Sequence, residues 1–127
     1  MAYVLGLDLG TSSLKGLLMN EKGESCGTAT ADYPLLHPAS GYSEQDPAEW
    51  IRACEIVFET LKAAVPDFTE ELQGISFSGQ MHSLVVLNDE QEVLRPAILW
   101  NDVRASAQCA KSMATCGDYL LAITRNI

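Results

Sequence analysis

Basic residues are scarce in this sequence, which argues against one class of partner. Eight lysines and arginines stand against 17 aspartates and glutamates, so the 127 residues carry a formal net charge of −9. Proteins that bind nucleic acid or an anionic membrane surface neutralise its phosphate groups with clustered lysine and arginine side chains. The sequence contains no such cluster. We therefore expect neither nucleic acid nor a membrane as a partner.

Cysteine motifs and long apolar runs are missing as well. The four cysteines lie far apart and form no Cys-x-x-Cys pair, at Cys26, Cys54, Cys109 and Cys116. This spacing argues against a zinc site or a disulfide framework and favours reduced, mostly buried thiols in a cytoplasmic protein. The apolar stretches fall far short of the roughly 20 residues that cross a bilayer, and the first residues lack the basic start of a signal peptide.

The remaining composition is typical of a globular α/β domain. Hydrophobic residues make up 47% and charged residues 20% of the chain, and apolar residues either form short β-favouring segments or recur at helical spacing. The pattern predicts three consecutive antiparallel strands, a helix and a fourth strand, at about 2–9, 13–20, 25–32, 47–64 and 72–78. Residues 33–45 contain too much proline and glycine for regular structure.

The helix over 47–64 has a clear start, because Asp46 is a candidate N-cap and Pro47 suits the first helical position. Its apolar face is predicted to hold Trp50, Ile51, Cys54, Val57, Phe58 and Leu61. After the fourth strand, residues 84–87 are predicted to continue as a strand. A last helix is expected over about 103–116, with Asp102 as a possible cap and Gly117 as its end. Residues 120–127 are ambiguous, and the chain reads as cut short.

A polar turn interrupts the first predicted hairpin. Asp8 ends an apolar strand, and the residues after it supply a close backbone approach and three hydroxyl groups: Gly10, Thr11, Ser12 and Ser13. N–H groups and hydroxyls in such a turn suit phosphate oxygens, and a carboxylate suits a divalent cation. A Walker loop and a dinucleotide site are excluded by the missing lysine and glycine patterns. The same residues also occur in ordinary turns, where they satisfy local backbone groups.

Two further polar clusters follow apolar segments, where α/β folds place ligand-binding groups. The first is Gln80-Met81-His82, and the second is Trp100-Asn101-Asp102 with Arg104 close by. Their amide, imidazole and carboxylate groups can bind sugar hydroxyls, and an indole ring offers a flat apolar wall to a sugar. The plainer interpretation makes His82 a packed residue, Asp102 a helix cap and Lys15 a solvated side chain.

Four motifs together resemble the FGGY carbohydrate kinases, and among these the bacterial xylulokinases most closely. The resemblance covers essentially all 127 residues, and the motifs follow one another in the family's order: Gly6-Leu-Asp-Leu-Gly-Thr-Ser-Ser13, Gly41-Tyr-Ser-Glu-Gln-Asp-Pro47, Gly79-Gln-Met-His82 and Leu94-Arg-Pro-Ala-Ile-Leu-Trp-Asn-Asp102. The resemblance implies an α/β, ribonuclease-H-like fold of the actin, hexokinase and heat-shock ATPase superfamily. Such a fold has a mixed sheet with an antiparallel three-strand meander and packed helices.

The resemblance also implies a reaction, the transfer of the γ-phosphoryl group of ATP to the 5-hydroxyl of D-xylulose with Mg²⁺. Residues 1–127 would be the N-terminal part of the first of two kinase domains. This incomplete first domain is expected to be inactive alone, because the general-base aspartate would lie beyond Ile127. A homodimer is the assembly that the family suggests.

The same resemblance implies roles for individual residues. Asp8 would be the catalytic carboxylate, next to the metal and the transferring phosphoryl group. The phosphates would lie beside the polar turn and one basic side chain, namely Gly10, Thr11, Ser12, Ser13 and Lys15. The sugar would meet residues of the other two clusters: Gln80, Met81, His82, Trp100, Asn101 and Asp102.

One residue departs from the xylulokinase pattern. Xylulokinases commonly have glycine after the Met-His pair, whereas this chain has Ser83, and Met-His-Ser is familiar from FGGY gluconokinases. Gluconate or the sugar of another FGGY kinase is therefore an alternative substrate. A non-catalytic sugar- or nucleotide-binding regulator with the same fold is an alternative of a different class.

Overall fold

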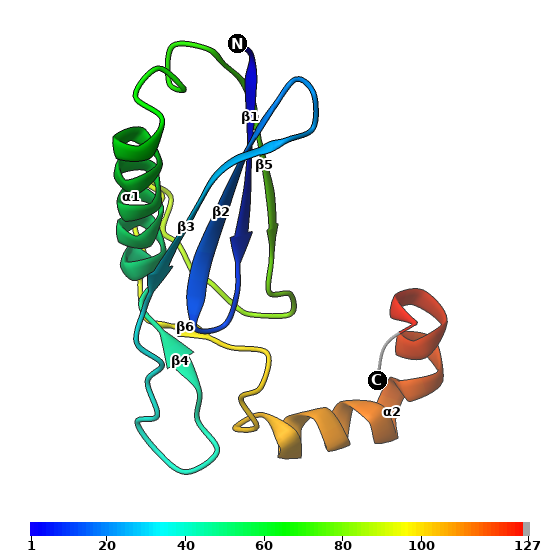
Figure 1. The fold of residues 1–127 in the computed structure, drawn as a ribbon. Coiled ribbons are helices and arrows are strands. Elements are labelled where there is room, and N and C mark those ends of the chain that lie inside the picture. Colours follow the sequence, from blue (N-terminus) through cyan, green and yellow to red (C-terminus); the bar gives the residue numbers. More distant parts are fainter. Residues whose placement is uncertain (126–127) are drawn as a thin grey trace.

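The computed structural model describes residues 1–125, and four strands within them form one mixed sheet (Figure 1). β1 (Tyr3–Leu9), β2 (Ser13–Asn20) and β3 (Ser25–Asp32) run antiparallel to one another in chain order. β5 (Leu72–Gly79) pairs in parallel with β1, so the strand order is β3-β2-β1-β5. The predicted three-strand meander and mixed sheet are confirmed.

The helix α1 (Pro47–Ala64) covers one face of this sheet along β2 and β3. Asp46 caps it as predicted, because its carboxylate accepts a hydrogen bond from the backbone N–H of Ala48 at 2.9 Å. Alternation in the strands turns every second side chain toward the helix. The resulting core includes Tyr3, Leu5, Leu7, Leu14, Leu18, Ala29, Ala31, Ala53, Val57 and Leu61.

The helix approaches the sheet closely at Gly16 of β2. A Cβ atom at this position would lie 2.4 Å from Cγ1 of Val57, so only glycine permits the contact. Val57 and Leu61 are fully buried as a result, and each such side chain contributes roughly 1.5–3 kcal/mol relative to exposure. The spacing predicts Ile51 on the same face, but Ile51 is exposed because the buried stripe passes through Ala53 instead.

A second, two-stranded sheet joins segments that are distant in the sequence. β4 (Glu44–Gln45) pairs antiparallel with β6 (Ala97–Ile98). The prediction of no regular structure over 33–45 is wrong at its end, because β4 depends on a distant partner that local sequence does not reveal. The predicted strand over 84–87 is wrong too, since these residues make single bridges in place of a ladder, Leu84 with Ile98 and Leu87 with Val93.

The helix α2 (Ser106–Thr124) extends away from the sheet (Figure 1), and none of its residues is buried. Its start differs from the predicted one, whereas the predicted end near Gly117 coincides with a break in the helix. The N-cap is Ala105, so Asp102 does not cap the helix. The backbone of Cys116 is non-helical (φ −146°, ψ 27°), and a second helical stretch follows this kink up to Thr124. Residues 126 and 127 of the ambiguous last segment lie outside the described residues.

All four cysteines are free, with Cys26 and Cys54 half-buried and Cys109 and Cys116 exposed on α2. The expectation of buried thiols fails on α2, because that helix buries no residue against the rest of the described chain. No helix within residues 1–125 combines the length and the apolar character that a membrane span requires.

Candidate functional site

The ends of β1 and β5 bring two of the predicted polar clusters together. These strands are parallel neighbours, so both end at the same edge of the sheet. The backbone N–H of Gln80 donates to the carbonyl of Leu9 at 2.8 Å, directly before the polar turn. Beyond Gln80, Met81 is exposed and His82 has a φ of 64°, which residues other than glycine rarely adopt. The Gln80-Met81-His82 segment therefore starts beside the Asp8 turn.

Tyr33 holds the polar turn from the end of β3. Its hydroxyl donates to the Gly10 carbonyl, and its backbone N–H donates to the Ser12 carbonyl at 3.1 Å. The turn closes on itself, because the N–H of Gly10 donates to the carbonyl of Ser13 at 2.9 Å. Burial, with a smaller effect of the Asp8 charge, raises the pKa of Tyr33 to about 12. The Tyr33 hydroxyl therefore stays protonated and able to donate at neutral pH.

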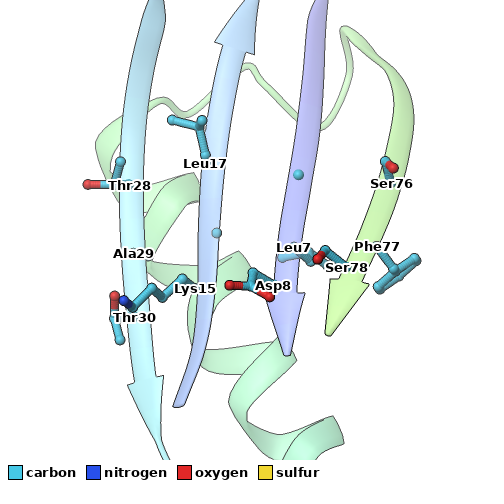
Figure 2. Close-up of a pocket in the computed structure, with 12 residues that line it drawn as sticks. Leu7, Asp8, Lys15, Leu17, Thr28, Ala29, Thr30, Ser76, Phe77 and Ser78 are labelled. Atoms are coloured by element: carbon cyan, nitrogen blue, oxygen red, sulfur yellow. The ribbon is translucent and has the colours of Figure 1, made fainter. Parts of the chain in front are cut away.

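Asp8 points to the face of the sheet that α1 does not cover (Figure 2). In the sheet register, Asp8 lies opposite Lys15 on β2 and opposite Ser78 on β5. These three residues line a depression of about 460 Å³ together with Leu17 and Thr28. Asp8 takes part in none of the ion pairs within residues 1–125. Its exposed carboxylate is therefore free to meet a cation or a reacting group, with the positive charge of Lys15 on the neighbouring strand.

One exposed carboxylate beside a polar turn fits Mg²⁺ that is held jointly with phosphate. Mg²⁺ prefers octahedral oxygen coordination and usually binds through one or two carboxylates, substrate phosphates and waters. Asp8 supplies such a carboxylate. No group of three or more histidine, cysteine, aspartate or glutamate side chains in the described chain could hold a metal ion by itself. A nucleotide phosphate would supply the remaining charged ligands.

Trp100 of the third cluster reaches both of the others. Its indole Nε1–H donates to the hydroxyl of Thr11 in the polar turn at 3.2 Å. Its backbone N–H donates to the hydroxyl of Ser83, next to His82, at 3.2 Å. The Trp100 side chain is still 56% exposed, and Asn101 beside it is exposed as well. The three polar clusters therefore meet at one edge of the sheet, with an open aromatic ring beside them.

Gln45 is a buried residue that contacts the first two clusters, although the sequence analysis did not identify it as a site residue. Its side chain is fully buried, at 0% exposure. Its Nε2 donates to the Thr11 carbonyl at 2.5 Å, and its Oε1 accepts from Nε1 of Trp50 at 3.0 Å and from Nε2 of Gln80 at 3.3 Å. A glutamine in a loop is ordinarily solvated, so the only sequence signal for this role was its place inside the Gly41–Pro47 motif.

Asp102 is engaged within the chain. Its side chain is 2% exposed and accepts hydrogen bonds from the guanidinium of Arg104 at 2.7 to 3.0 Å and from the backbone N–H of Ser43 at 2.7 Å. Arg104 also pairs with Glu44 of β4 at 2.7 Å. The hydrogen bonds from Arg104 hold the pKa of Asp102 well below its usual range and raise the pKa of Arg104 in turn. Asp102 therefore braces β4 against the segment after Trp100, and a contact with sugar stays a prediction.

Comparison with known sequences identifies a family and several relatives that match this chain. The family model described as the FGGY family of carbohydrate kinases, N-terminal domain, matches residues 3–126. A xylulose kinase of Lactococcus lactis is 56% identical over 127 residues, which are 100% of this chain and 25% of that protein. The chain thus spans about a quarter of the length of the curated relatives it matches.

Solved structures agree on the fold. A xylulose kinase from Brucella ovis has a TM-score of 0.93 at 46% identity, covering 98% of this chain and 26% of that chain. A gluconate kinase from Lactobacillus acidophilus has a TM-score of 0.83 at 29% identity, covering 90% of this chain and 23% of that chain. The predicted ribonuclease-H-like fold of the actin and hexokinase superfamily is confirmed by these neighbours.

Proposed function

Because this chain belongs to the FGGY family of carbohydrate kinases, we propose that the complete kinase to which it contributes transfers the γ-phosphoryl group of ATP to the 5-hydroxyl of D-xylulose. In this proposal residues 1–127 form the N-terminal part of the first domain, and the general base comes from outside them. The hydrogen bond between Trp100 and Thr11 carries the proposal. It joins an aromatic ring that suits a sugar to the polar turn that suits phosphate.

On the phosphate side, phosphoryl transfer needs positioning and charge neutralisation more than covalent chemistry. Asp8 is the proposed catalytic carboxylate and metal ligand, and its freedom from ion pairs in the described chain supports that role. Mg²⁺, when bound, neutralises charge on the phosphates of ATP. The proposed phosphate contacts are the N–H groups and hydroxyls of the turn and one amine: Gly10, Thr11, Ser12, Ser13 and Lys15.

On the sugar side, exposed groups form the proposed binding surface. Met81 and His82 are exposed where they follow β5, and the open Trp100 ring offers a wall to the C–H face of a sugar. Asn101 adds an exposed amide that can donate to and accept from hydroxyls. Two proposed contacts are less accessible, Gln80 and Asp102. The groups proposed for sugar and for phosphate thus lie at the same edge of the sheet.

A coupled ATP-consumption assay on the purified full-length kinase tests the proposal, with D-xylulose, D-gluconate, L-ribulose and glycerol measured side by side. We expect kcat/KM for D-xylulose to exceed the other values by at least about tenfold, which corresponds to about 1.4 kcal/mol in the transition state. Absence of turnover with every sugar would contradict the kinase proposal and favour the sugar- or nucleotide-binding regulator. In this proposal the 127-residue chain alone is inactive, because the general base comes from outside it.

Gluconate is the second candidate substrate, and Ser83 is the observation that favours it. Met-His-Ser is familiar from FGGY gluconokinases, and the chain also resembles a gluconate kinase in structure. The hydroxyl of Ser83 accepts from the backbone N–H of Trp100, so the residue that departs from the xylulokinase pattern lies against the proposed sugar wall. A preference for D-gluconate in the same assay would select this alternative.

We propose further that the kinase is a cytoplasmic homodimer. Four free thiols support a reducing compartment, and a homodimer is the assembly that the resemblance to the FGGY kinases suggests. Sedimentation velocity on the full-length kinase tests the assembly. A monomer at every accessible concentration would contradict it.

A further inference from the structure

The Gln45 side chain is held in one orientation by partners that each have a single hydrogen-bonding role. The indole N–H of Trp50 can only donate, and the Thr11 carbonyl can only accept. The atom 3.0 Å from Nε1 of Trp50 is therefore the side-chain oxygen of Gln45, and the atom 2.5 Å from the Thr11 carbonyl oxygen is its nitrogen. If the amide were rotated by 180°, its NH₂ group would face the indole N–H of Trp50 and its oxygen would face the Thr11 carbonyl.

This orientation passes on to Gln80. The side-chain oxygen of Gln45 accepts a second hydrogen bond, from Nε2 of Gln80 at 3.3 Å. The Gln80 nitrogen is thereby directed at Gln45, and the Gln80 oxygen is directed elsewhere. That oxygen is buried and accepts no hydrogen bond within residues 1–125. Since an unpaired buried acceptor is costly, Gln80 is set to receive a hydroxyl or water donor at the start of the Met81-His82 segment.

The backbone of Gln45 extends the connection to the third cluster. Gln45 pairs with Ala97 across the β4–β6 ladder, three residues before Trp100. The indole of Trp100 returns to Thr11, whose carbonyl the Gln45 side chain holds. One buried residue therefore contacts the phosphate turn, the amide of the second cluster and the segment that carries the aromatic wall.

We propose that Gln45 is a positioning residue that couples the sugar side of the site to the phosphate turn, with Trp50 setting the direction of its amide. The proposal rests on the proposed kinase function, because it concerns how the same site is assembled. Gln45 is 0% exposed, so it acts through Thr11 and Gln80 and not by touching a substrate. Loss of its amide therefore changes the rate and the sugar affinity together.

Two substitutions and one matched control separate this role from general stability. Gln45→Met keeps the length of the side chain and removes its donor and its acceptor. Trp50→Phe keeps an aromatic ring on α1 and removes the indole donor. Asn20→Leu removes a different buried amide, which bonds to Glu24 at 2.8 Å at the end of β2 that is remote from the polar turn. The control therefore has the stability cost of losing a buried amide, but its side chain makes no hydrogen bond to the site residues.

In the full-length kinase, Gln45→Met is expected to lower kcat/KM for the sugar by about tenfold to a hundredfold, with kcat reduced and the sugar KM raised. Trp50→Phe is expected to give a smaller loss of the same kind and no further loss in the Gln45→Met background, because it acts through that amide. Asn20→Leu is expected to lower Tm and leave kcat and KM at wild-type values. Additive losses from Trp50→Phe and Gln45→Met, or wild-type kinetics in Gln45→Met, overturn the proposal.

A second readout does not depend on activity. In the full-length protein labelled with ¹⁵N-tryptophan, the indole resonances of Trp50 and Trp100 are assigned with Trp50→Phe and Trp100→Phe. Gln45→Met is expected to shift both resonances, that of Trp50 directly and that of Trp100 through Thr11, whereas Asn20→Leu shifts neither. Trp50→Phe provides the same Trp100 readout if Gln45→Met does not fold.

The two readouts separate failure of this proposal from failure of the kinase function. A Trp100 resonance that does not move in either variant overturns the coupling, whatever the activity. A wild-type protein that phosphorylates none of the four sugars, but in which Gln45→Met shifts both resonances, overturns the kinase function and supports the positioning role.

Discussion

The indole Nε1 of Trp100 and the hydroxyl oxygen of Thr11 lie 3.2 Å apart, although the two residues are 89 positions apart in the sequence. Thr11 belongs to the turn that suits phosphate, and Trp100 carries the ring that suits a sugar. The hydrogen bond is therefore a direct link between the two halves of the proposed reaction. Each partner is also held from a second side, Thr11 by Gln45 and Trp100 by Ser83.

Trp100→Phe tests this link, because it keeps the aromatic wall and removes the donor. We expect kcat/KM for the sugar in the full-length kinase to fall roughly fivefold, the effect of about one neutral hydrogen bond. The substitution is expected to add nothing in a Thr11→Val background, where the acceptor is already missing. Equal losses from Trp100→Phe in both backgrounds would show that the hydrogen bond does not matter to the reaction.

Asp8→Asn tests the proposed catalytic carboxylate with almost no change in shape. We expect kcat to fall by at least about a hundredfold, since a charge aimed at the reacting centre is lost, while the sugar KM stays near the wild-type value. Steady-state kinetics with varied Mg²⁺ and ATP provide the measurement. Asp89→Asn, in an exposed loop, is the control for loss of one negative charge. A sugar KM that rises as steeply as kcat falls would place Asp8 on the sugar side instead.

Ser83→Gly tests whether the residue that departs from the xylulokinase pattern sets substrate choice. The change removes the acceptor of the Trp100 backbone N–H, so Trp100 loses one of the two hydrogen bonds that hold it in place. We expect the sugar KM to rise roughly threefold to tenfold and the ratio of kcat/KM for D-xylulose and D-gluconate to change. An unchanged ratio would assign Ser83 to loop structure alone.

The lowered pKa of Asp102 predicts how the stability of the protein changes with pH. Hydrogen bonds from Arg104 lower its pKa on folding, so the folded state favours the ionised form. This stabilisation is complete above the pKa of an unfolded aspartate, about 3.9, and is lost as the pH falls below that value toward the folded pKa. Asp102→Asn is therefore expected to destabilise the protein at pH 7 and to flatten the fall in stability below about pH 5.

Urea midpoints of the full-length protein at a series of pH values from 7 to 3 measure this dependence. Glu59→Gln, on the exposed side of α1, is the matched loss of a carboxylate outside the Arg104 network. An Asp102→Asn variant with the same slope of stability against pH as the wild type would contradict the assignment.

Local sequence signals were sufficient for most of the framework. Short apolar segments divided by turn residues predicted β1, β2 and β3, and the Asp46-Pro47 pair predicted the start of α1, because both signals depend on neighbours a few residues apart. Gly117 marked the break in α2 at Cys116, but no local signal predicted the second helical stretch that follows it up to Thr124. β4 and β6 were missed because a two-residue strand carries no periodicity and exists only through its distant partner.

The candidate site divides in the same way. Asp8, Gln80 and Trp100 stood out because each is a polar or amphipathic residue where an apolar segment ends. Their mutual contacts could not be read from the sequence, because they depend on parallel pairing of β1 with β5 and on the β4–β6 ladder. Gln45 was missed for that reason, since only its surroundings make it different from a solvated glutamine.

The β4–β6 ladder also has a consequence for the order of folding. β1, β2, β3 and α1 follow one another along the chain, so their contacts close short loops at low entropic cost. The ladder joins its two segments through only two residue pairs, and these segments are far apart in the sequence. The candidate site is therefore expected to assemble late and to open at lower free energy than the core. On gradual heating, activity of the full-length kinase should decline before its circular dichroism does, as the site melts on a sheet that is still folded.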